Sequence, residues 1–433
     1  MNISFNNIVG KIKPMHAVNN LPLVGVSETM HRYVSEAGMP FVRLHDTGGV
    51  YGMNRYVDVP NIFRDFDADE NDPDSYDFAF TDWLLQSITA QKAKIFYRLG
   101  TSIETAQHIK AYRIYPPKDY EKWARICEHI IMHYNEGWAN GFHYGIEYWE
   151  IWNEPDSFPD IEDNCMWKGT FEEYLELYRV ASLYLKERFP HLKIGGYASC
   201  GFYSIFPDGY VGAANSSERT DYFMECFHKF MKYAVKNKLP LDFFSWHSYS
   251  DSAKNIEYQK YVRGELDKYG FTGTQSILNE WNPGTARRGT LADSAYIAEM
   301  MIKMQNTTCD MLMYYNGDVK GRYDGLYDPI TGEPFKAYYA FSAFNELYRL
   351  GNQTAVYEIP EGLSCLAASD GKKKAILITN TGEKQCLTIT SDIKTDFTIY
   401  RINEFMDLEA DGKTDLAGEL QIETFETILL AGE

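Results

Sequence analysis

Residues 148–156 read YWEIWNEPD, an apolar stretch that ends in Asn153, Glu154 and a proline. A second stretch, SILNEWNP at residues 276–283, has the same design, with Asn279 and Glu280 at the end of an apolar run. Short apolar runs bounded by turn residues are typical of buried strands in a parallel sheet. Each glutamate therefore stands at the carboxyl end of a predicted strand.

Around these two segments, strands and helices alternate through the first 350 residues. Eight apolar stretches predict strands, at residues 11–17, 40–45, 94–99, 147–153, 192–197, 241–249, 275–280 and 311–315. Amphipathic patterns predict helices between and after them, most clearly at 76–91, 119–138, 171–189, 221–236, 295–305 and 336–349. Thr170 stands just before the helix predicted from residue 171, and Glu173 lies in its first turn. Together they form a capping-box pattern.

Eight strand–helix units match a (β/α)8 barrel, also called a TIM barrel, within the α/β class. A doubly wound sheet is the alternative. The two glutamates end the fourth and seventh predicted strands, and in a barrel the carboxyl ends of all strands face one pocket. A barrel thus lets Glu154 and Glu280 meet, which favours it over the doubly wound sheet.

The composition changes after Gly351. The last of the eight tryptophans is Trp281, and short alternating strands are predicted at 374–379, 386–391, 398–402, 419–422 and 427–430. We therefore expect two domains, a barrel at residues 1–350 and a C-terminal β-sandwich at residues 351–433. A strand pattern at residues 3–8 leaves open whether about the first ten residues join the sandwich.

The charge and cysteine content narrow the class of protein. The chain has 42 Lys and Arg against 61 Asp and Glu, a formal net charge of −19, which disfavours a nucleic-acid partner. No stretch is long and apolar enough for a membrane span, and the N-terminal residues do not resemble a signal peptide. Seven cysteines at irregular spacing indicate free thiols in a reducing compartment, so we expect a cytoplasmic protein with no membrane partner.

An acidic stretch and a pair of histidines each resemble part of a metal site, but each lacks residues that metal binding would need. An EF-hand loop counted from Asp67 in the acidic stretch 65–74 would have Asp72 and Phe78 where glycine and glutamate are needed. His129 and His133 have the spacing of metal ligands on a helix, but no glutamate base lies between them and no third ligand is evident. We expect neither a metal nor a cofactor.

Two carboxylates at one pocket suit glycoside hydrolysis. One acid must carry a proton for the leaving oxygen, and the other must be ionised to attack the sugar or to activate water. A separation of about 5–5.5 Å would make the second carboxylate a nucleophile and retain the anomeric configuration. Asn153 can hold a sugar hydroxyl beside the reaction centre, and Trp281 can offer an apolar face to the sugar ring.

The WNEP sequence on the fourth predicted strand and Asn-Glu-Trp on the seventh resemble the large clan of retaining barrel glycosidases. Within that clan, the chain most resembles glycoside hydrolase family 39, the β-xylosidase and α-L-iduronidase family, over nearly its whole length. The resemblance implies a barrel followed by a sandwich, with Glu154 as the general acid/base and Glu280 as the nucleophile.

The resemblance also implies supporting residues. The arginine that the family carries on its second strand matches Arg43, which lies with His45 in the sequence FVRLHD at residues 41–46. A buried arginine would lower the pKa of the nucleophile. A histidine and a tyrosine on the sixth strand match His247 and Tyr249, and we expect Tyr249 to donate a hydrogen bond to the nucleophile. The alternative is that these side chains form structural ion pairs or hydrogen bonds in the core.

Substrate contacts are implied on the first and eighth strands. His16 and Asn19 match a substrate-contact segment of the family. The family's eighth strand commonly offers a tryptophan as a floor for the sugar, whereas this chain has Tyr314 and Tyr315, either of which can replace it. Loops at 158–168, 202–219 and 283–291 are expected to shape the pocket.

We therefore expect a retaining glycoside hydrolase that acts by double displacement on short oligosaccharides or other glycosides, first of all as a β-xylosidase. The same machinery could instead cleave β-galactosides, α-L-arabinosides or α-L-iduronides. Iduronide binding would require a cationic clamp, which Arg287 and Arg288 could supply. The alternative of another class is a non-hydrolytic carbohydrate-binding protein, although a binder needs neither glutamate. The oligomeric state, including a homo-oligomer, stays open.

Overall fold

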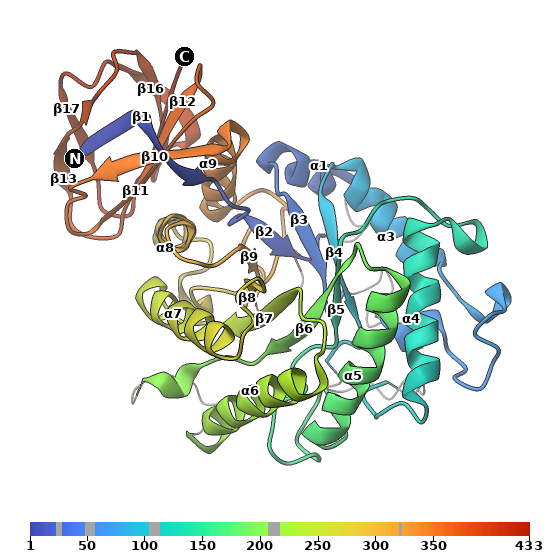
Figure 1. The fold of residues 1–433 in the computed structure, drawn as a ribbon. Coiled ribbons are helices and arrows are strands. Elements are labelled where there is room, and N and C mark those ends of the chain that lie inside the picture. The colour runs from blue at the N-terminus through green and yellow to red at the C-terminus, as the bar shows by residue number, and fades with distance from the viewer. Residues whose placement is uncertain (23–27, 48–56, 104–112, 207–216, 320–322) are drawn as a thin grey trace.

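The computed structural model describes the chain except for residues 23–27, 48–56, 104–112, 207–216 and 320–322. Eight parallel strands close into a barrel in chain order, which is the (β/α)8 fold predicted from the sequence (Figure 1). The barrel strands are β2 (Ala17–Asn19), β3 (Phe41–Leu44), β4 (Lys94–Leu99), β5 (Tyr148–Ile151), β6 (Lys193–Ser199), β7 (Phe243–Ser248), β8 (Gln275–Trp281) and β9 (Met311–Tyr314).

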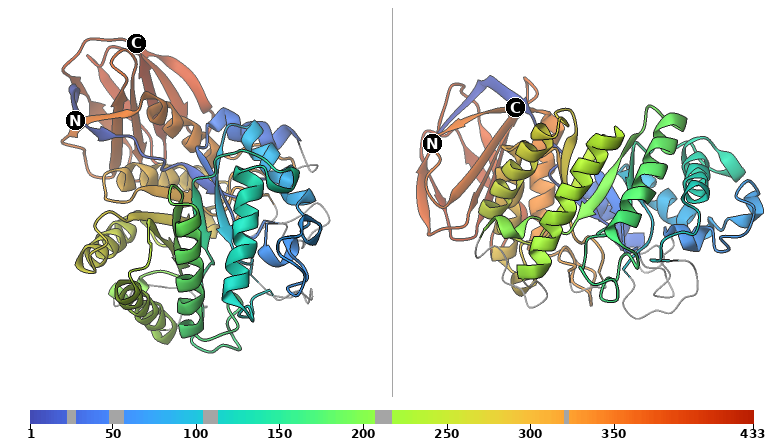
Figure 2. Two further views of the ribbon diagram at one scale, coloured as in Figure 1. Left: turned by 45° about the vertical axis from the view of Figure 1, so that its right-hand side comes forward. Right: turned by 60° about the horizontal axis from the view of Figure 1, so that its bottom comes forward.

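Helices cover the outside of the barrel (Figure 2). They are α1 (Glu28–Ala37), the short α2 (Val59–Ile62), α3 (Ala79–Ala90), α4 (Tyr120–Asn135), α5 (Phe171–Arg188), α6 (Ser217–Asn237), α7 (Ser252–Lys268), α8 (Leu291–Gln305) and α9 (Lys336–Leu350). The predicted capping box is present at α5, where the Thr170 hydroxyl accepts from the N–H of Glu173 and the Glu173 carboxylate accepts from the N–H of Thr170. Helices α1, α2 and α7 were not among the helices that the sequence predicted most clearly.

The alternation of side chains along each barrel strand decides which residues face the pocket. In β3, Val42 and Leu44 join the large core between strands and helices, whereas Phe41 belongs to a small separate cluster inside the barrel. Successive side chains of a strand point to opposite faces. Arg43, two residues after Phe41, therefore also points into the barrel.

The first predicted strand, at residues 11–17, is wrong. Lys11 ends β1 (Asn2–Lys11), which pairs with β10 (Asn352–Tyr357) and β14 (Thr390–Ser391) rather than with the barrel. The barrel strand begins only at Ala17. Pro14 lies between them, and a proline cannot donate to a strand ladder.

The C-terminal region is built from sheets, and both chain ends lie there (Figure 1). Its eight-stranded sheet has the order β14-β1-β10-β11-β12-β18-β15-β16, and β13 pairs separately with β17. Their bounds are β11 (Leu363–Ser369), β12 (Lys374–Asn380), β13 (Gln385–Thr388), β15 (Phe397–Ile402), β16 (Asp407–Thr414), β17 (Glu419–Ile422) and β18 (Thr427–Gly432). The predicted strand 386–391 is thus divided between β13 and β14, and β10, β11 and β16 were not predicted.

Two apolar cores lie on opposite faces of the large sheet. Ile376 of β12 belongs to a core that also holds Leu420 of β17, whereas the next residue, Leu377, joins the core of the barrel and its helices. One face of the sheet therefore packs on the small β13–β17 sheet, and the other contributes to the barrel core.

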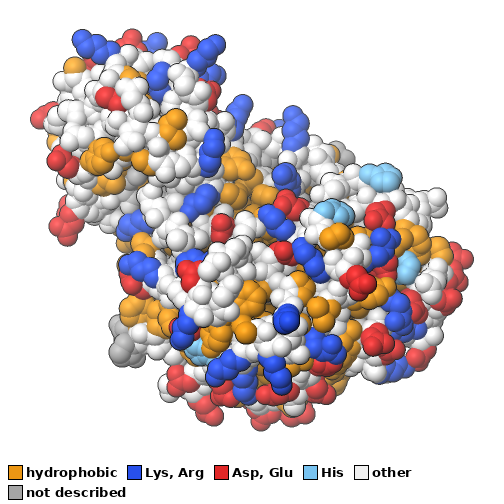
Figure 3. Space-filling model, viewed as in Figure 1, with side chains coloured by type: hydrophobic (Ala, Val, Ile, Leu, Met, Phe, Trp, Pro, Cys, Tyr) orange, Lys and Arg blue, Asp and Glu red, His pale blue; other side chains and the backbone are white. Residues whose placement is uncertain are grey.

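Charged side chains of both signs are interspersed over the face of the molecule shown in Figure 3. Within the described ranges of the chain, no helix has the length and apolar character needed to cross a membrane. All seven cysteines fall within these ranges, and none of them forms a disulfide.

Candidate active site

An irregularity in β8 brings Glu280 into the barrel. Leu278 pairs with Trp246 of β7, but the next paired residue of β7, His247, lies opposite Glu280, so that Asn279 is an extra residue in the ladder. Such a bulge places two successive side chains on one face. Asn279 and Glu280 both make hydrogen bonds to groups inside the barrel, whereas the flanking Leu278 belongs to the outer core.

Glu154 lies in the turn that follows β5. Its backbone has a positive φ of 45°, and Trp152 before it has a φ of 72°. This left-handed conformation is uncommon for residues other than glycine and persists only where the surroundings hold it. The N–H of Glu154 donates to the carbonyl of Ala198 on β6 at 3.1 Å, which ties the turn to the neighbouring strand.

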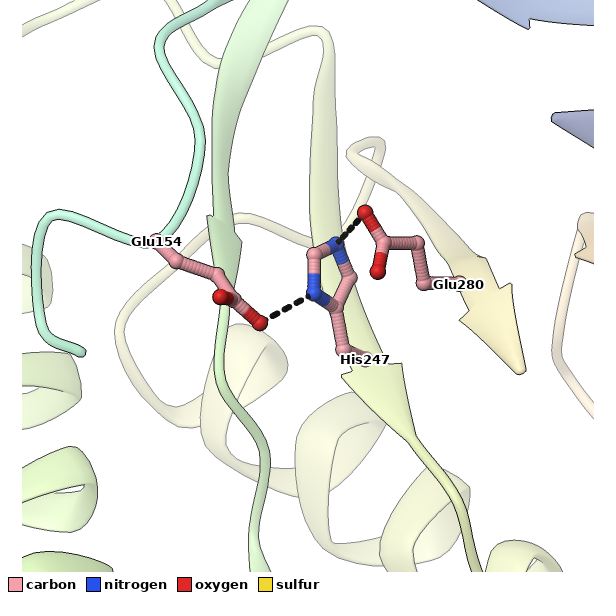
Figure 4. A group of neighbouring side chains, drawn as sticks. All are labelled: Glu154, His247 and Glu280. Carbon is pink, nitrogen blue, oxygen red and sulfur yellow. Dashed lines mark hydrogen bonds and ion pairs between the residues drawn. The ribbon is translucent and has the colours of Figure 1, made fainter. Parts of the chain in front are cut away.

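The two predicted catalytic carboxylates meet at one place. One carboxylate oxygen of Glu154 lies within 4.8 Å of one of Glu280. His247 lies between them, with Nδ1 2.7 Å from Oε1 of Glu154 and Nε2 3.5 Å from Oε1 of Glu280 (Figure 4). This separation is close to that of retaining glycosidases and leaves no room for the water that an inverting enzyme needs between its carboxyl groups.

Arg43 is the centre of the hydrogen bonds beneath the pair. Its Nη1 donates to Oε1 of Glu280 at 2.8 Å and to Asn19 at 3.0 Å, and its Nη2 donates to Oδ1 of Asn153 at 2.6 Å. Its Nε donates to Oε2 of Glu150 at 2.8 Å. Asn19 and Asn153, predicted as substrate contacts, are thus brought to the site, and each gives its amide oxygen to Arg43.

Glu280 is held at both oxygens. Oε1 accepts from Arg43, and Oε2 accepts from the hydroxyl of Tyr249 at 2.8 Å, which is the contact expected for Tyr249. Two donors on different oxygens fix the plane of the carboxylate. The Glu280 side chain is 6% exposed and that of Glu154 is 23% exposed, so Glu154 lies on the more open side of the site.

The three bridged groups shift one another's ionisation. Burial raises the pKa of Glu280, and the charges of His247 and Arg43 offset this only in part, so the pKa stays above its usual value. Arg43 acts in the expected direction, but burial outweighs it. Burial also raises the pKa of Glu154, yet the hydrogen bond and charge of His247 lower it below its usual value. Burial lowers the pKa of His247, but the charge of Glu280 and the bond to Glu154 raise it overall.

His45 and Tyr315 complete this side of the pocket. Nε of Arg98 donates to Nδ1 of His45 at 3.2 Å, so the ring proton lies on Nε2. That nitrogen is 3.5 Å from Oδ1 of Asp46 and 3.8 Å from Oε1 of Glu280. The Tyr315 hydroxyl donates to the other oxygen of Asp46 at 3.1 Å. Of the two tyrosines that could replace the family's tryptophan, Tyr315 is the one at the site.

The structure corrects the predictions for Trp281 and Tyr314. Their rings pack edge to face at 5.4 Å, and Tyr314 lies 5.7 Å from Phe341 of α9. Both belong to the core between strands and helices. The reason is the strand alternation, because Trp281 follows the inward pair of the β8 bulge and Tyr314 precedes the inward Tyr315.

His16 is a third correction. It precedes β2, and its ring packs on Phe344 and Tyr348 of α9 at 5.2 and 4.9 Å. Burial lowers its pKa to about 4, so it is a neutral core histidine rather than a substrate contact.

The possible cationic clamp is also not at the pair. The Arg287 guanidinium lies over the ring of Tyr296 on α8 at 4.1 Å, and Arg288 lies close to Gly325. Of the loops expected to shape the pocket, residues 207–216 lie outside the described residues.

Sequence reasoning missed three buried charged residues of the site. Glu150 and Arg98 are 0% exposed, and each is flanked by apolar residues within its strand. A charge in such a strand is costly to bury unless it is paired, and this signal could have pointed to both. Asp156 is also buried and accepts from the Ser199 hydroxyl at 3.0 Å; burial and the charge of Glu154 raise its pKa to about 7.

Comparisons with known proteins bear on the fold and the family. The model of the family described as glycosyl hydrolases family 39 matches residues 28–318. A β-xylosidase of Geobacillus stearothermophilus is 27% identical over 230 residues, and a β-xylosidase of Caldicellulosiruptor saccharolyticus is 28% identical over 222 residues. These alignments cover 50% and 47% of this chain and 39% of each relative, so the chain matches about two fifths of their length.

Solved structures share the fold over essentially the whole chain. A glucosidase from Croceicoccus marinus superposes with a TM-score of 0.78 at 20% identity, covering 99% of this chain and 98% of the other. A monomeric β-xylosidase from Caulobacter crescentus CB15 superposes with a TM-score of 0.71 at 15% identity, covering 100% and 99%. At these identities the likeness extends to the architecture of barrel and sheets.

Proposed function

This chain belongs to glycosyl hydrolases family 39, and from that premise we propose that it is a retaining glycoside hydrolase that acts on short oligosaccharides by double displacement. The observation that carries the proposal is the approach of Glu154 and Glu280 to within 4.8 Å across His247. Carboxylates this close suit a covalent intermediate rather than direct attack by water.

In the first step, an oxygen of Glu280 bonds to the anomeric carbon while the bond to the leaving oxygen breaks. Glu154 gives its proton to that oxygen. Arg43 and Tyr249 hold the two oxygens of Glu280, which keeps the attacking oxygen aligned with the sugar.

In the second step, the roles of the two glutamates reverse. Glu154, now a carboxylate, takes a proton from water, and the water oxygen bonds to the anomeric carbon as the bond to Glu280 breaks. The more exposed position of Glu154 suits this step, because the leaving group departs and the water arrives on that side.

The proton that Glu154 needs can be held within the site. His247 and Glu154 are joined by a hydrogen bond of 2.7 Å, and together they share one proton. In the free site the raised pKa of His247 and the lowered pKa of Glu154 favour the proton on the imidazole. A glycosidic oxygen placed against Glu154 excludes water and lets the same proton pass through Glu154 to the leaving group.

A β-xyloside is the substrate that we propose first, because the relatives from Geobacillus stearothermophilus and Caldicellulosiruptor saccharolyticus are named β-xylosidases. His45 offers an Nε2–H beside Glu280, and the amide nitrogen of Asn153 can donate to a sugar hydroxyl because its oxygen is taken by Arg43. Tyr315 can serve as the floor of the sugar site in place of the family's tryptophan.

A panel of aryl glycosides tests this proposal. We expect cleavage of an aryl β-xyloside, with β-galactoside, α-L-arabinoside and α-L-iduronide as the competing arms. Product analysis by NMR should show retention, and inversion would exclude the double displacement. A sugar-induced rise in thermal stability without cleavage of any glycoside would instead indicate a carbohydrate-binding protein.

The nucleophile is tested by Glu280→Gly with added azide. We expect turnover to be lost and then restored as a glycosyl azide whose configuration is opposite to that of the retained product, because azide fills the space of the missing carboxylate. Glu383→Gly in an exposed turn is the matched control, and azide should not change its activity. Full activity of Glu280→Gly would remove Glu280 from the mechanism.

We further propose two domains, a barrel within residues 1–350 and a β-sandwich at residues 351–433 that β1 (Asn2–Lys11) joins, and a cytoplasmic location. The pairing of β1 with β10 supports the first point, and seven cysteines without a disulfide suit a reducing compartment. Recovery of the activity from the culture medium or the cell envelope would contradict the location.

A further inference from the structure

We propose that Glu150 is a positioning residue for the nucleophile, which shares the charge of Arg43 and so keeps Glu280 reactive. The inference rests on the proposed role of Glu280. Glu150 lies in the strand four residues before Glu154, and its side chain is fully buried beneath the pair.

The contacts of Glu150 form a row of alternating charge. Its Oε2 lies 2.8 Å from Nε and 2.7 Å from Nη2 of Arg43, and Nη1 of Arg43 lies 2.8 Å from Glu280. Its other oxygen, Oε1, accepts from Nδ2 of Asn279 at 2.6 Å. The β8 bulge thus lets Asn279 contact Glu150 and Glu280 contact Arg43. These contacts connect β8 to both Glu150 and Arg43.

The row matters because Arg43 donates directly to an oxygen of the nucleophile. In a buried site, an arginine paired only with Glu280 would stabilise its carboxylate strongly, and a strongly stabilised carboxylate is a weak base and a weak nucleophile. Glu150 contacts Nε and Nη2 of Arg43 and neutralises part of its charge. Glu280 therefore receives a single charge-assisted hydrogen bond, from Nη1. Arg43 thus aligns the carboxylate of Glu280 without greatly reducing its nucleophilicity.

The substitution Glu150→Gln can remove the charge while keeping the hydrogen bonds. The amide oxygen of glutamine can still accept from Arg43, but its NH2 group would face Nδ2 of Asn279. Oδ1 of Asn279 has no hydrogen-bond partner within the described residues, so rotation of the Asn279 amide by half a turn lets it accept from the glutamine. The variant therefore separates the effect of charge from that of lost contacts.

We expect the acid limb of the kcat/KM profile of Glu150→Gln to move to lower pH, because loss of the negative charge lowers the pKa of Glu280. The maximal kcat should fall about tenfold as the nucleophile weakens. The double variant Glu150→Gln with Asn279→Asp returns a negative charge to the row, and it should move the acid limb back toward that of the wild type. Glu147→Gln, which removes a surface carboxylate paired with Lys193, is the matched control and should leave the profile unchanged.

The titration of Glu280 can also be measured without turnover. Carbon-13 NMR of labelled glutamate carboxyls, with Glu280 assigned through Glu280→Gln, should show the Glu280 titration at lower pH in Glu150→Gln. If the wild type cleaves no glycoside, the proposed function fails while this titration still tests Glu150. An unmoved titration, or lost activity with an unmoved acid limb, would overturn the inference and leave Glu150 a structural residue. If Glu150→Gln does not fold, Glu150→Asp keeps the charge and must keep the acid limb.

Discussion

The imidazole of His247 is the side chain that joins the two glutamates. Because its positive charge faces both, it lowers the pKa of Glu154 and also that of Glu280, whose pKa burial raises. Glu154 must be protonated and Glu280 ionised for the first step, so His247 acts on both limbs of a pH–rate profile.

Replacing His247 by glutamine tests this role. Loss of the imidazolium charge should raise the pKa of Glu280, so the acid limb of the kcat/KM profile should move to higher pH. Activity at the optimum should fall about tenfold, because Glu154 no longer shares a proton with the imidazole. His228→Gln on the helix layer, where His228 contacts Tyr261 and Tyr269, is the control and should keep the wild-type profile. An acid limb that stays in place or moves to lower pH would speak against this role of His247.

A second residue-scale prediction concerns Asp293 on α8, which is 1% exposed. Burial outweighs the charges of Arg288 and Arg287 and raises its pKa from 3.8 to about 7. Since the folded-state pKa lies above that of the unfolded chain, the stabilisation from the bound proton is complete below about pH 4 and is lost as the pH rises through 7. The loss corresponds to roughly 4 kcal/mol.

Asp293→Asn should therefore match the wild type in stability near pH 4 and exceed it at pH 8. Urea unfolding at both pH values measures the difference. The exposed Glu187→Gln is the control and should show no such crossover. Equal stability of Asp293→Asn and the wild type at pH 8 would contradict the prediction.

At the scale of single elements, α5 shows how local signals support the site. It follows the turn that carries Glu154, and its capping box satisfies backbone N–H groups that a helix start leaves without partners. Tyr174 of this helix donates to the carbonyl of Ile151 at the end of β5 at 3.0 Å. The start of α5 is thus fixed against the strand from which the acid/base turn departs.

We expect Thr170→Ala to lower the free energy of unfolding by about 1 kcal/mol, the usual cost of a lost N-cap. Activity at 25 °C should stay near that of the wild type, because the packed face of α5 is untouched. Ser87→Ala, which removes a hydroxyl bonded to the Trp83 carbonyl within α3, is the control and should not destabilise the protein. Urea titration distinguishes the two, and equal stability of the pair would exclude a capping effect.

At the scale of the whole molecule, the barrel and the C-terminal sheets share apolar contacts. Leu377, Ala375 and Leu429 of the large sheet belong to the same core as α8 and α9. Thr381 donates to Glu299 of α8, and Lys336 at the start of α9 pairs with Asp407 of β16 at 2.6 Å. The sheet therefore supports the two helices that follow β8 and β9.

Leu377→Ala should lower the free energy of unfolding by about 2–5 kcal/mol, because it leaves a cavity between the sheet and the helices. Hydrolysis should be lost at a lower temperature on heating, although kcat at 25 °C should be nearly unchanged. Leu183→Ala, a leucine of α5 that is 39% exposed, is the matched control and should change stability by less than about 0.5 kcal/mol. Unaltered heat inactivation of Leu377→Ala would mean that the barrel does not depend on the sheet.

The local pattern of the chain determined the barrel and its two glutamates. Alternating strands and helices, the WNEP turn and the capping box at Thr170 are all read over a few neighbouring residues. Apolar spacing records which face a helix or strand buries, and the carboxyl ends of parallel strands share one side of a barrel. These rules suffice to bring Glu154 and Glu280 to one pocket.

Only the tertiary structure decided which neighbours of these residues face the sugar. Trp281 and Tyr314 point to the helices, and Tyr315 to the site, because one extra residue in β8 and the register of β9 set the direction of each side chain. The entry of β1 into the second sheet and the row of Glu150, Arg43 and Glu280 likewise depend on partners far along the chain. Strand register and charge pairing are properties of segments brought together by folding, so no short stretch of sequence contains them.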